Sequence, residues 1–390
     1  MTSETFSVLV CSGGAAWELA MVRGLGRPEL GIRVARRCVD HGELLGTALR
    51  DRPRAVLVDA SLPWVDRDLV TTLRRAGIET IAIGTSARPL EQIGVHRLPA
   101  ETSPEAVSTL VFGFDEARPL AGSGPVEQES SPNSGRLVAV WGAGGAPGRS
   151  TVAVHLAVEA ASTGNRTLLI DGDVWSASIA QSLELGETPS ITQAARLAAD
   201  GWPKPITECV QAGPDNVAVL VGLARAELWP EVREDSWRAV LAAAVLEYDL
   251  VVVDLAAPIE EDEELAFDRV PFRRNLVTTV VLEQADEIVM VVASDPIGLR
   301  RAVMAHQLLM ERTPATAAVK VVLNRTPRSG RRMQDCSRAV SAWIGTRPLA
   351  LLPQEPDFTR VVWEGRPLQA VAPKSAWLRE LRVVANAVTS

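Results

Sequence analysis

The sequence predicts two α/β domains with mostly parallel sheets, and three observations carry this prediction. Short apolar runs alternate with amphipathic stretches along the 390 residues, as strands and covering helices do. Near-continuous apolar runs such as VVVD and IVMVVAS are typical of strands buried on both faces. A Gly-, Pro- and Ser-rich segment at residues 116–135 lacks apolar periodicity and indicates a flexible linker. We therefore expect one domain over residues 1–115 and a second over 136–390.

The first domain is predicted to be a small flavodoxin-like unit. Helical patterns such as Glu43–Arg50 and Asp66–Ala76 lie between short apolar runs. Five strands within about 110 residues fit that doubly wound architecture. The expected strands are Ser7–Val10, Ile32–Arg36, Ala55–Val58, Thr80–Ile83 and Val95–Leu98.

The second domain is predicted to be a larger doubly wound, mostly parallel sheet. Its strands are longer and more apolar than those of the first domain. They are expected at Leu137–Trp141, Thr167–Ile170, Val217–Val221, Leu250–Val253, Ile288–Ala293, Val319–Leu323 and Leu349–Leu352.

Composition narrows the classes of function. The net charge is −8, from 40 basic and 48 acidic residues, which argues against nonspecific capture of DNA or anionic lipid. No apolar run reaches the roughly 18 residues that span a bilayer. Four scattered cysteines and four histidines argue against a disulfide scaffold or a structural zinc site. We expect a cytoplasmic protein.

The most informative segment is LVAVWGAGGAPGRSTVAVHLAVEAA, residues 137–161. A buried strand enters a glycine-rich turn, and Ser150-Thr151 opens a helix, which is the setting in which backbone N–H groups bind phosphate. Against the pattern GxxxxGK[ST], Ala143–Ser150 reads AGGAPGRS, with Ala143 for the first Gly and Arg149 for the Lys. Arg149 keeps the charge but presents a bulkier planar group. The alternative is a tight turn without a ligand.

Three aspartates follow predicted strands beside this turn. Asp171 and Asp173 end the run TLLIDGD, and Asp254 ends YDLVVVD. Carboxylates at the C-terminal ends of parallel strands can hold Mg²⁺ through water and orient an attacking water. The alternative for any one of them is a helix cap or a turn residue.

These motifs resemble the ParA/MinD group of deviant-Walker P-loop ATPases. The resemblance rests on AGGAPGRST, LLIDGDVWSASIAQSLEL, YDLVVVDLAAP, LEQADEIVMVVASDPIGLRRAV and VVLNR ahead of LLPQEP, and it covers roughly residues 136–388. A receiver-like domain ahead of such an ATPase is similar to CpaE and TadZ, which position Tad/Flp pilus machinery, and to the actinobacterial septum-site regulator branch.

The resemblance implies ATP and Mg²⁺ as ligands. Ser150 would ligate Mg²⁺, with Asp254 supporting it through water, and Thr151 would touch the α-phosphate. Asp173 would be the water-activating aspartate and Asn324 would recognise the adenine edge. The backbone of the following residues would cradle the phosphates: Gly145, Ala146, Pro147, Gly148, Arg149, Ser150 and Thr151.

The loop departs from the family pattern at two lysines. Arg149 replaces one, and the lysine that reaches across the dimer falls at Gly144. Because phosphoryl transfer depends on positioned positive charge, we expect weak or absent ATP hydrolysis with binding retained.

The first domain resembles a response-regulator receiver, with Asp59 at the phosphoacceptor position. VLVCSGG supplies no acidic residue after the first strand, and Leu98 rather than Lys precedes Pro99. The interpretation favoured is a pseudo-receiver used as a docking surface, with phosphorylation of Asp59 as the alternative.

The C-terminal stretch SAWLRELRVVANAV has helical apolar spacing. Packing against the sheet is favoured, and peripheral membrane contact is the alternative.

The hypothesis is a nucleotide-dependent spatial regulator. ATP binding would favour a homodimer that contacts pilus-assembly or division proteins, with recruitment to a cell pole or septum. Two alternatives stay open: a nucleotide-independent scaffold with a decayed loop, and a chromosome-partitioning ATPase, which the net charge disfavours because partitioning requires nonspecific DNA binding.

Overall fold

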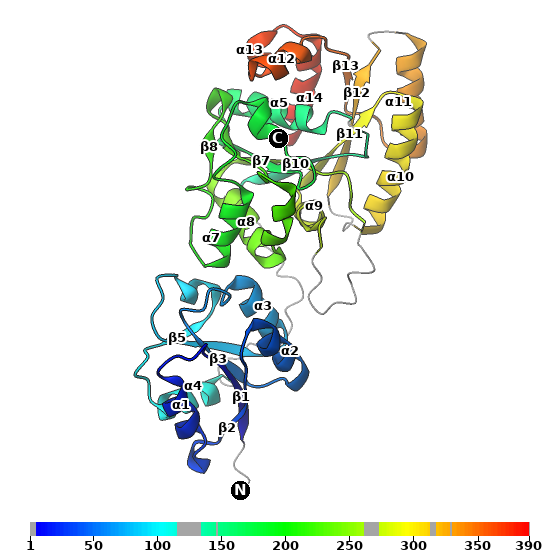
Figure 1. Cartoon of the computed structure of the whole chain (residues 1–390). Helices are drawn as coiled ribbons and strands as arrows, with labels where there is room; N and C mark the ends of the chain where they lie inside the picture. Colours follow the sequence, from blue (N-terminus) through cyan, green and yellow to red (C-terminus); the bar gives the residue numbers. More distant parts are fainter. Residues whose placement is uncertain are drawn as a thin grey trace. The chain divides into compact units, whose positions relative to one another are not determined.

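The computed structural model describes residues 5–114, 134–145, 147–260, 273–312, 317–327 and 330–389. The chain divides into two compact units (Figure 1). One comprises Met1–Glu129 with Leu197–Pro203, and the other Ser130–Arg196 with Lys204–Ser390. Of the predicted linker, residues 116–133 lie outside the described residues.

The first unit is a five-stranded parallel sheet in the order β2-β1-β3-β4-β5. This is the flavodoxin-like order, so the predicted fold of this unit is confirmed. Its strands are β1 (Phe6–Cys11), β2 (Ile32–Arg37), β3 (Ala55–Asp59), β4 (Glu79–Ile83) and β5 (His96–Leu98). Its helices are α1 (Glu18–Leu25), α2 (His41–Asp51), α3 (Arg67–Arg75) and α4 (Pro104–Gly113), with 3₁₀ turns at Pro28–Leu30 and Leu90–Ile93.

Alternating side chains of β1 fill the two faces of this sheet. Leu9 packs in the cluster that contains residues of α2 and α3, whereas Val8 and Val10 pack with residues of α1 and α4. Short polar side chains fix where the helices start: Asp40 accepts the Glu43 N–H, and the same arrangement recurs at α3 and α4.

The second unit is an eight-stranded sheet in the order β13-β12-β11-β6-β10-β7-β9-β8. The pair β8–β9 is antiparallel and the other pairs are parallel. Its strands are β6 (Arg136–Trp141), β7 (Thr167–Gly172), β8 (Gln211–Ala212), β9 (Ala218–Leu220), β10 (Leu250–Leu255), β11 (Glu287–Ala293), β12 (Ala318–Thr326) and β13 (Ala350–Pro353). The seven predicted strands are confirmed; the two-residue β8 was too short for its pattern to reveal.

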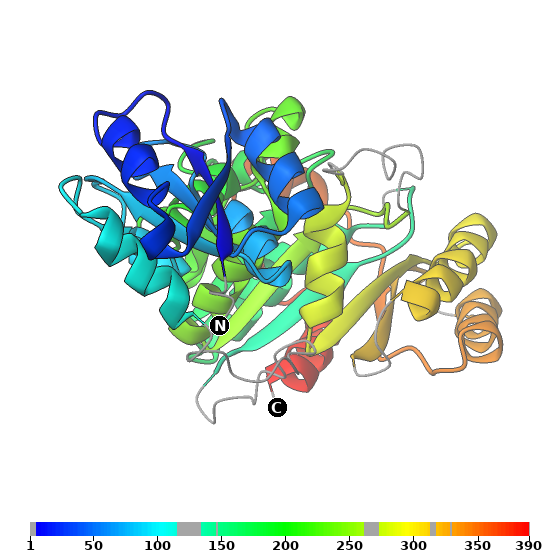
Figure 2. The same cartoon turned by 90° about the horizontal axis from the view of Figure 1, so that it is seen from below.

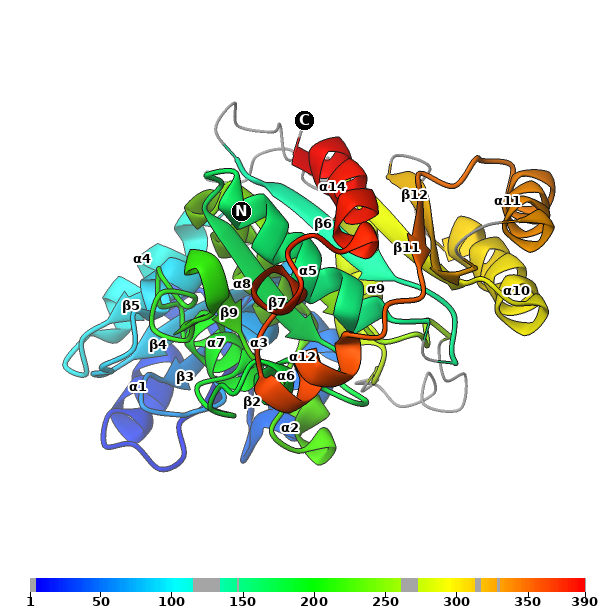
Figure 3. The ribbon, with the colours of Figure 1, turned by 90° about the horizontal axis from the view of Figure 1, so that it is seen from above.

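The helices of this unit are α5 (Arg149–Ser162), α6 (Ile179–Ser182), α7 (Ile191–Ala199), α8 (Glu234–Glu247), α9 (Leu276–Gln284), α10 (Pro296–Arg312), α11 (Arg331–Trp343), α12 (Phe358–Glu364), α13 (Leu368–Val371) and α14 (Ala376–Thr389), with 3₁₀ turns at Pro214–Asn216 and Ala226–Glu231. Helices α5 and α14 lie together over one face of the sheet, as Figure 3 shows. Helices α8 and α9 contact each other and the central strands on the other face. Helices α10 and α11 lie side by side at the β11–β13 end (Figure 2).

The C-terminal helix is part of the core. Trp377, Leu378, Leu381 and Val384 of α14 are buried, and the helix contacts α5 and β13. The predicted packing is confirmed, and the alternative of a membrane-surface helix is wrong because its apolar face is already covered. None of the helices that the structure describes has the length and apolar character required to cross a bilayer.

Candidate functional site

The glycine-rich turn forms a cradle between β6 and α5. Gly145 has φ +106° and Gly148 has φ +99°, conformations that favour glycine over any residue with a Cβ. Gly148 immediately precedes α5, and its carbonyl accepts the Val152 N–H. The first N–H groups of the 14-residue helix therefore face the turn without intrahelical acceptors, which suits an anion. Ala146 lies outside the described residues.

Arg149 is held within the site by backbone carbonyls. Its Nε donates to Leu255 O at 2.9 Å, and its Nη1 donates to Gly142 O at 3.3 Å and Ala143 O at 3.1 Å. Its Nη2 is 3.7 Å from Oδ2 of Asp173, and the side chain is only 15% exposed. The guanidinium thus ties β10 to the turn, because its planar fork places donors on separate nitrogens facing the two segments.

The three predicted aspartates come together at the C-terminal ends of β7 and β10. These strands are parallel neighbours, and Asp254 lies opposite Asp171 in their register. Asp171 accepts the N–H groups of Ser178, Ile179 and Asp173. Burial nevertheless raises the pKa of Asp171 to about 6, against the lowering effect of these three donors. Asp171 is therefore a structural anchor for the turn into α6.

Asp173 lies between the turn and the segment that follows β7. Its Oδ1 accepts the N–H groups of Trp175 and Ser176, both at 2.9 Å. The other oxygen faces Arg149. Its predicted role as the water-activating aspartate stays a prediction, since one oxygen caps a local turn and the other faces a cation.

Asp254 is the unusual member of the trio. It is 1% exposed, and no backbone N–H of the described residues donates to either carboxylate oxygen. Burial, followed by the negative charge of Asp171, raises the pKa of Asp254 well above its ordinary value. The Ser150 side chain, through a hydrogen bond, and the positive charge of Arg149 act in the opposite direction. A buried carboxylate that no backbone N–H stabilises is costly, so this position fits a group that brings positive charge or further donors.

The residues present fit a hydrated Mg²⁺ better than a metal held by the protein alone. The described part of the chain has no cluster of three or more His, Cys, Asp or Glu side chains able to ligate a metal. Mg²⁺ commonly keeps several waters and takes one or two protein oxygens together with phosphate oxygens. The Ser150 hydroxyl and the Asp254 carboxylate would hold such an ion, with nucleotide phosphates supplying further ligands.

Asn324 lies against the turn in this structure. Its Nδ2 donates to Pro147 O at 2.8 Å, and its Oδ1 accepts the Trp377 indole N–H at 3.1 Å. The residue is 5% exposed, and a Cβ added to Gly148 would lie 2.4 Å from Nδ2. Asn324, on β12, therefore links the turn to Trp377 of α14. Adenine recognition by this residue stays a prediction.

One contact beside the trio was not anticipated from the sequence. Arg274 lies over the Trp175 ring at 3.5 Å, and the Trp175 indole N–H donates to Asn275 at 3.0 Å. Asn275 in turn donates to Glu260 O at 2.7 Å. The turn that Asp173 caps is thus connected to the start of α9. No sequence motif marks this contact, because its partners are about 100 residues apart.

Asp59 of the first unit is fully engaged by neighbouring donors. The Trp17 indole N–H donates to Oδ2 at 2.8 Å, and Ser61 donates to Oδ1 through its backbone N–H at 2.9 Å and through its hydroxyl. Glu18, the first acidic residue after β1 in the sequence, is bound by Ser12 and Arg37. Both carboxylate oxygens of Asp59 therefore already accept hydrogen bonds, and the docking role of this unit stays a prediction.

His155 of α5 is a buried packing residue, whose ring contacts Phe358 and Trp377. Its Nδ1 lies 2.6 Å from Thr151 O, its Nε2 accepts the Leu368 N–H at 2.9 Å, and burial lowers its pKa to about 4. The four cysteines are buried free thiols.

Comparison with known proteins identifies the fold. The chain matches no protein-family model and no curated protein. Three solved structures align with 65% of the chain, a share close to that of the second unit. The cell division ATPase MinD of Pyrococcus furiosus is 20% identical over 98% of its length, with a TM-score of 0.52. The septum site-determining protein MinD of Pyrococcus horikoshii, complexed with Mg-ADP, is 19% identical over 95%, with a TM-score of 0.52. A ParA family ATPase of Chlorobium tepidum is 21% identical over 98%, with a TM-score of 0.55.

At these identities the likeness establishes the architecture: this chain contains the mostly parallel α/β fold of the MinD and ParA P-loop ATPases.

Proposed function

We propose that this protein is a nucleotide-dependent spatial regulator that binds Mg·ATP at the turn between β6 and α5. The observation that carries the proposal is the buried Asp254 carboxylate, which no backbone N–H stabilises, beside Ser150 at the start of α5. A carboxylate left in this state is costly unless a cation completes it. The glycine-built turn supplies the anion site next to it.

The chain's own groups would divide the work of binding. The free N–H groups at the start of α5 would bind phosphate oxygens, and the helix dipole favours the same charge. Ser150 and Asp254 would hold Mg²⁺, whose chemistry when bound is to neutralise phosphate charge. Arg149 would keep β10 and the turn in register, because its donors already serve three carbonyls.

We propose that hydrolysis is weak or absent, on the basis of the same geometry. Phosphoryl transfer requires positive charge aimed at the transferring group, and Arg149 is committed to backbone carbonyls. Asp173 has one oxygen engaged in a turn. In this proposal ATP binding shifts the protein between two conformations because ATP has a higher affinity for one of them. Hydrolysis would serve only to return the protein to the other conformation.

The spatial role is supported by the fold shared with MinD proteins described as a cell division ATPase and as septum site-determining. We extend it to a homodimer that contacts pilus-assembly or division proteins in the cytoplasm, at a pole or septum. The pseudo-receiver over residues 1–115 would be the docking domain, because Asp59 is occupied by Trp17 and Ser61.

Calorimetric titration of the full chain with ATP and ADP, with and without Mg²⁺, tests the proposal, with phosphate release followed in the same samples. We expect Mg²⁺-dependent ATP binding with slow or no release. The double variant Gly148→Val, Ser150→Ala should lose ATP binding. The control variant Ser162→Ala, at the other end of α5, should bind ATP with unchanged affinity. No binding by the unaltered chain, or full affinity in the double variant, would refute it.

A second candidate is a nucleotide-independent scaffold whose loop no longer binds nucleotide. It is favoured by the hydrogen bonds that Arg149 and Asn324 donate to the carbonyl groups of the turn itself. The same titration separates the two, because the scaffold predicts no nucleotide binding. A chromosome-partitioning role is the third candidate, and the net charge of −8 disfavours it.

A further inference from the structure

A second arginine lies against the glycine-rich turn, on the side opposite β10. Arg301 belongs to α10, the helix that follows β11, and β11 is the other neighbour of β6 in the sheet. Its Nη1 is 3.4 Å from Gly144 O, and a Cβ added to Gly145 would lie 2.1 Å from the same nitrogen. Arg301 and the turn line a common pocket of 240 Å³.

The two arginines differ in how firmly they are held. Arg149 is mostly buried and donates three hydrogen bonds to carbonyls, two of them at 3.1 Å or less. Arg301 is exposed and its contact with Gly144 is at the long limit of a hydrogen bond. Arg301 would therefore lose little interaction free energy if it exchanged this one weak contact with a carbonyl for a contact with a phosphate oxygen.

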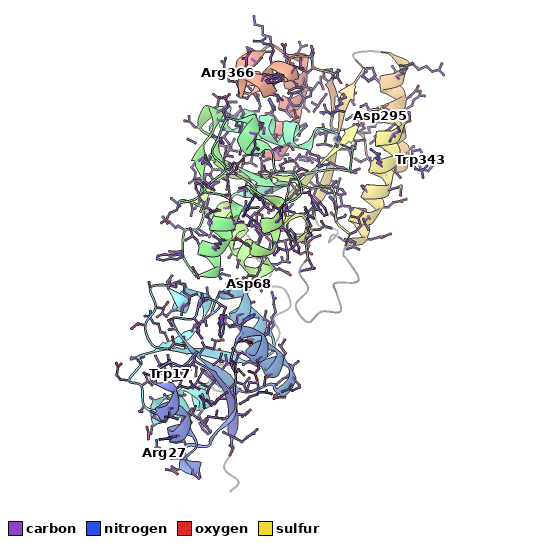
Figure 4. The ribbon with its side chains drawn as sticks, viewed as in Figure 1. Trp17, Arg27, Asp68, Asp295, Trp343 and Arg366 are labelled. Atoms are coloured by element: carbon purple, nitrogen blue, oxygen red, sulfur yellow. The ribbon has the colours of Figure 1, made fainter. Side chains whose placement is uncertain are left out.

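The other charged side chain lining this pocket is Asp295, at the start of α10 (Figure 4). Its Oδ1 accepts the N–H groups of Ile297 and Gly298, both at 2.9 Å, so it serves as the cap of that helix. The positive charge of Arg301 is thus left facing the turn. The pocket that the turn and α10 line has a volume of 240 Å³, and a Cβ added to Gly144 would meet nothing within 4 Å.

We propose that Arg301 contacts the terminal phosphate of a nucleoside triphosphate bound at the turn. Arg301 would supply from α10 a positive charge for the phosphate, because Arg149, the arginine of the turn, donates to backbone carbonyls instead. The inference rests on the proposed function. A guanidinium binds phosphate through two parallel N–H donors, and such charge-assisted bonds are stronger than neutral ones. Arg301 is a binding residue in this assignment, and Arg149 is a positioning residue.

Titration of the full chain with Mg·ATP and Mg·ADP, comparing Arg301→Ala with the unaltered chain, tests this assignment. We expect Arg301→Ala to weaken ATP binding about 10- to 100-fold, the effect of losing one charge-assisted contact, and to weaken ADP binding less than about threefold. Arg301→Lys should recover part of the ATP affinity. Arg300→Ala is the matched control, because Arg300 lines a separate 850 Å³ pocket between α10 and α11; it should leave both affinities unchanged.

The outcomes separate this assignment from the proposed function. If the unaltered chain binds ATP and Arg301→Ala binds it equally well, the role of Arg301 is refuted and the proposed function stands. If Arg301→Ala and Arg300→Ala weaken ATP binding alike, the effect is general electrostatics and the assignment is also refuted. If the unaltered chain binds neither nucleotide, the proposed function fails, and this inference with it.

Discussion

Asp254 and Asp171 lie opposite each other on the parallel strands β10 and β7, yet only Asp171 accepts hydrogen bonds from backbone N–H groups. Burial raises the pKa of both carboxyl groups, and the charge of Asp171 raises that of Asp254 further, whereas three backbone N–H groups lower the pKa of Asp171. No backbone group compensates Asp254, which leaves it suited to a bound cation. This asymmetry distinguishes a structural aspartate from a ligand-binding one.

Replacing the buried Asp254 carboxyl should stabilise the nucleotide-free chain. Asp254→Asn removes a buried charge that no backbone N–H compensates, and we expect an increase of about 1–3 kcal/mol in the free energy of unfolding. Denaturant unfolding at neutral pH without nucleotide measures it, and Mg²⁺-dependent ATP binding should fall in the same variant. Asp249→Asn, which alters an exposed carboxylate bound by Arg166, should give no stabilisation. A less stable Asp254→Asn would show that Ser150 and Arg149 already compensate the Asp254 charge.

The same pair predicts a pH dependence. The folded-state pKa of Asp171 is about 6 and that of Asp254 is also raised, so the folded chain binds more protons than the unfolded chain above pH 4. Their contribution to stability is therefore full below about pH 4 and declines as the pH rises through the folded-state pKa values.

The contribution of Asp254 is isolated by comparing the pH dependence of stability of the unaltered chain with that of Asp254→Asn. His155 acts in the opposite sense, because its lowered pKa costs stability as the pH falls below 6.5. The stability difference between variant and unaltered chain should increase between pH 4 and pH 8, measured by unfolding at each pH. A difference that is constant with pH would contradict the raised pKa of Asp254.

Gly148 is predicted to be intolerant of any side chain. With φ +99° and a Cβ position 2.4 Å from Asn324 Nδ2, Gly148→Ala should destabilise the fold by about 1–3 kcal/mol and abolish nucleotide binding. Gly144→Ala is the matched control, since a Cβ there meets nothing within 4 Å. Thermal unfolding of both variants checks this, and equal melting temperatures would show that Asn324 does not brace the turn.

Arg149 is predicted to increase the free energy of unfolding of the nucleotide-free chain. Arg149→Ala leaves the carbonyls of Leu255, Gly142 and Ala143 without this donor, so we expect a loss of about 1–3 kcal/mol in the nucleotide-free chain. Arg166→Ala, which removes an exposed ion pair with Asp249, should stay close to the unaltered chain. If only nucleotide binding changes in Arg149→Ala, its role is at the ligand instead.

Asp59 is expected to resist phosphorylation. Trp17 and Ser61 occupy both carboxylate oxygens, so a small-molecule phosphodonor with Mg²⁺ should leave Asp59 unmodified by mass spectrometry. Trp17→Phe removes one donor and provides the comparison. A phosphorylated Asp59 in the unaltered chain would contradict the pseudo-receiver interpretation.

The sequence by itself determined the order of strands along the chain, the parallel α/β class and the position of the glycine-rich turn. These follow from local patterns: runs such as VVVD indicate buried strands, and positive-φ glycines occur where the chain must turn sharply. The same patterns placed Asp171, Asp173 and Asp254 at strand ends. They could not distinguish Asp171 from Asp254, because both end an equally apolar run.

Tertiary structure alone decided which polar groups are satisfied and by whom. Asn324 meets Pro147 and Trp377, and Arg301 meets Gly144, across separations of 53 to 177 residues. Such contacts depend on which strands become neighbours in the sheet, and β11 beside β6 brings α10 to the turn. The free energy of a polar side chain depends on its donors and on burial, and neither is encoded in the residues adjacent to it in sequence.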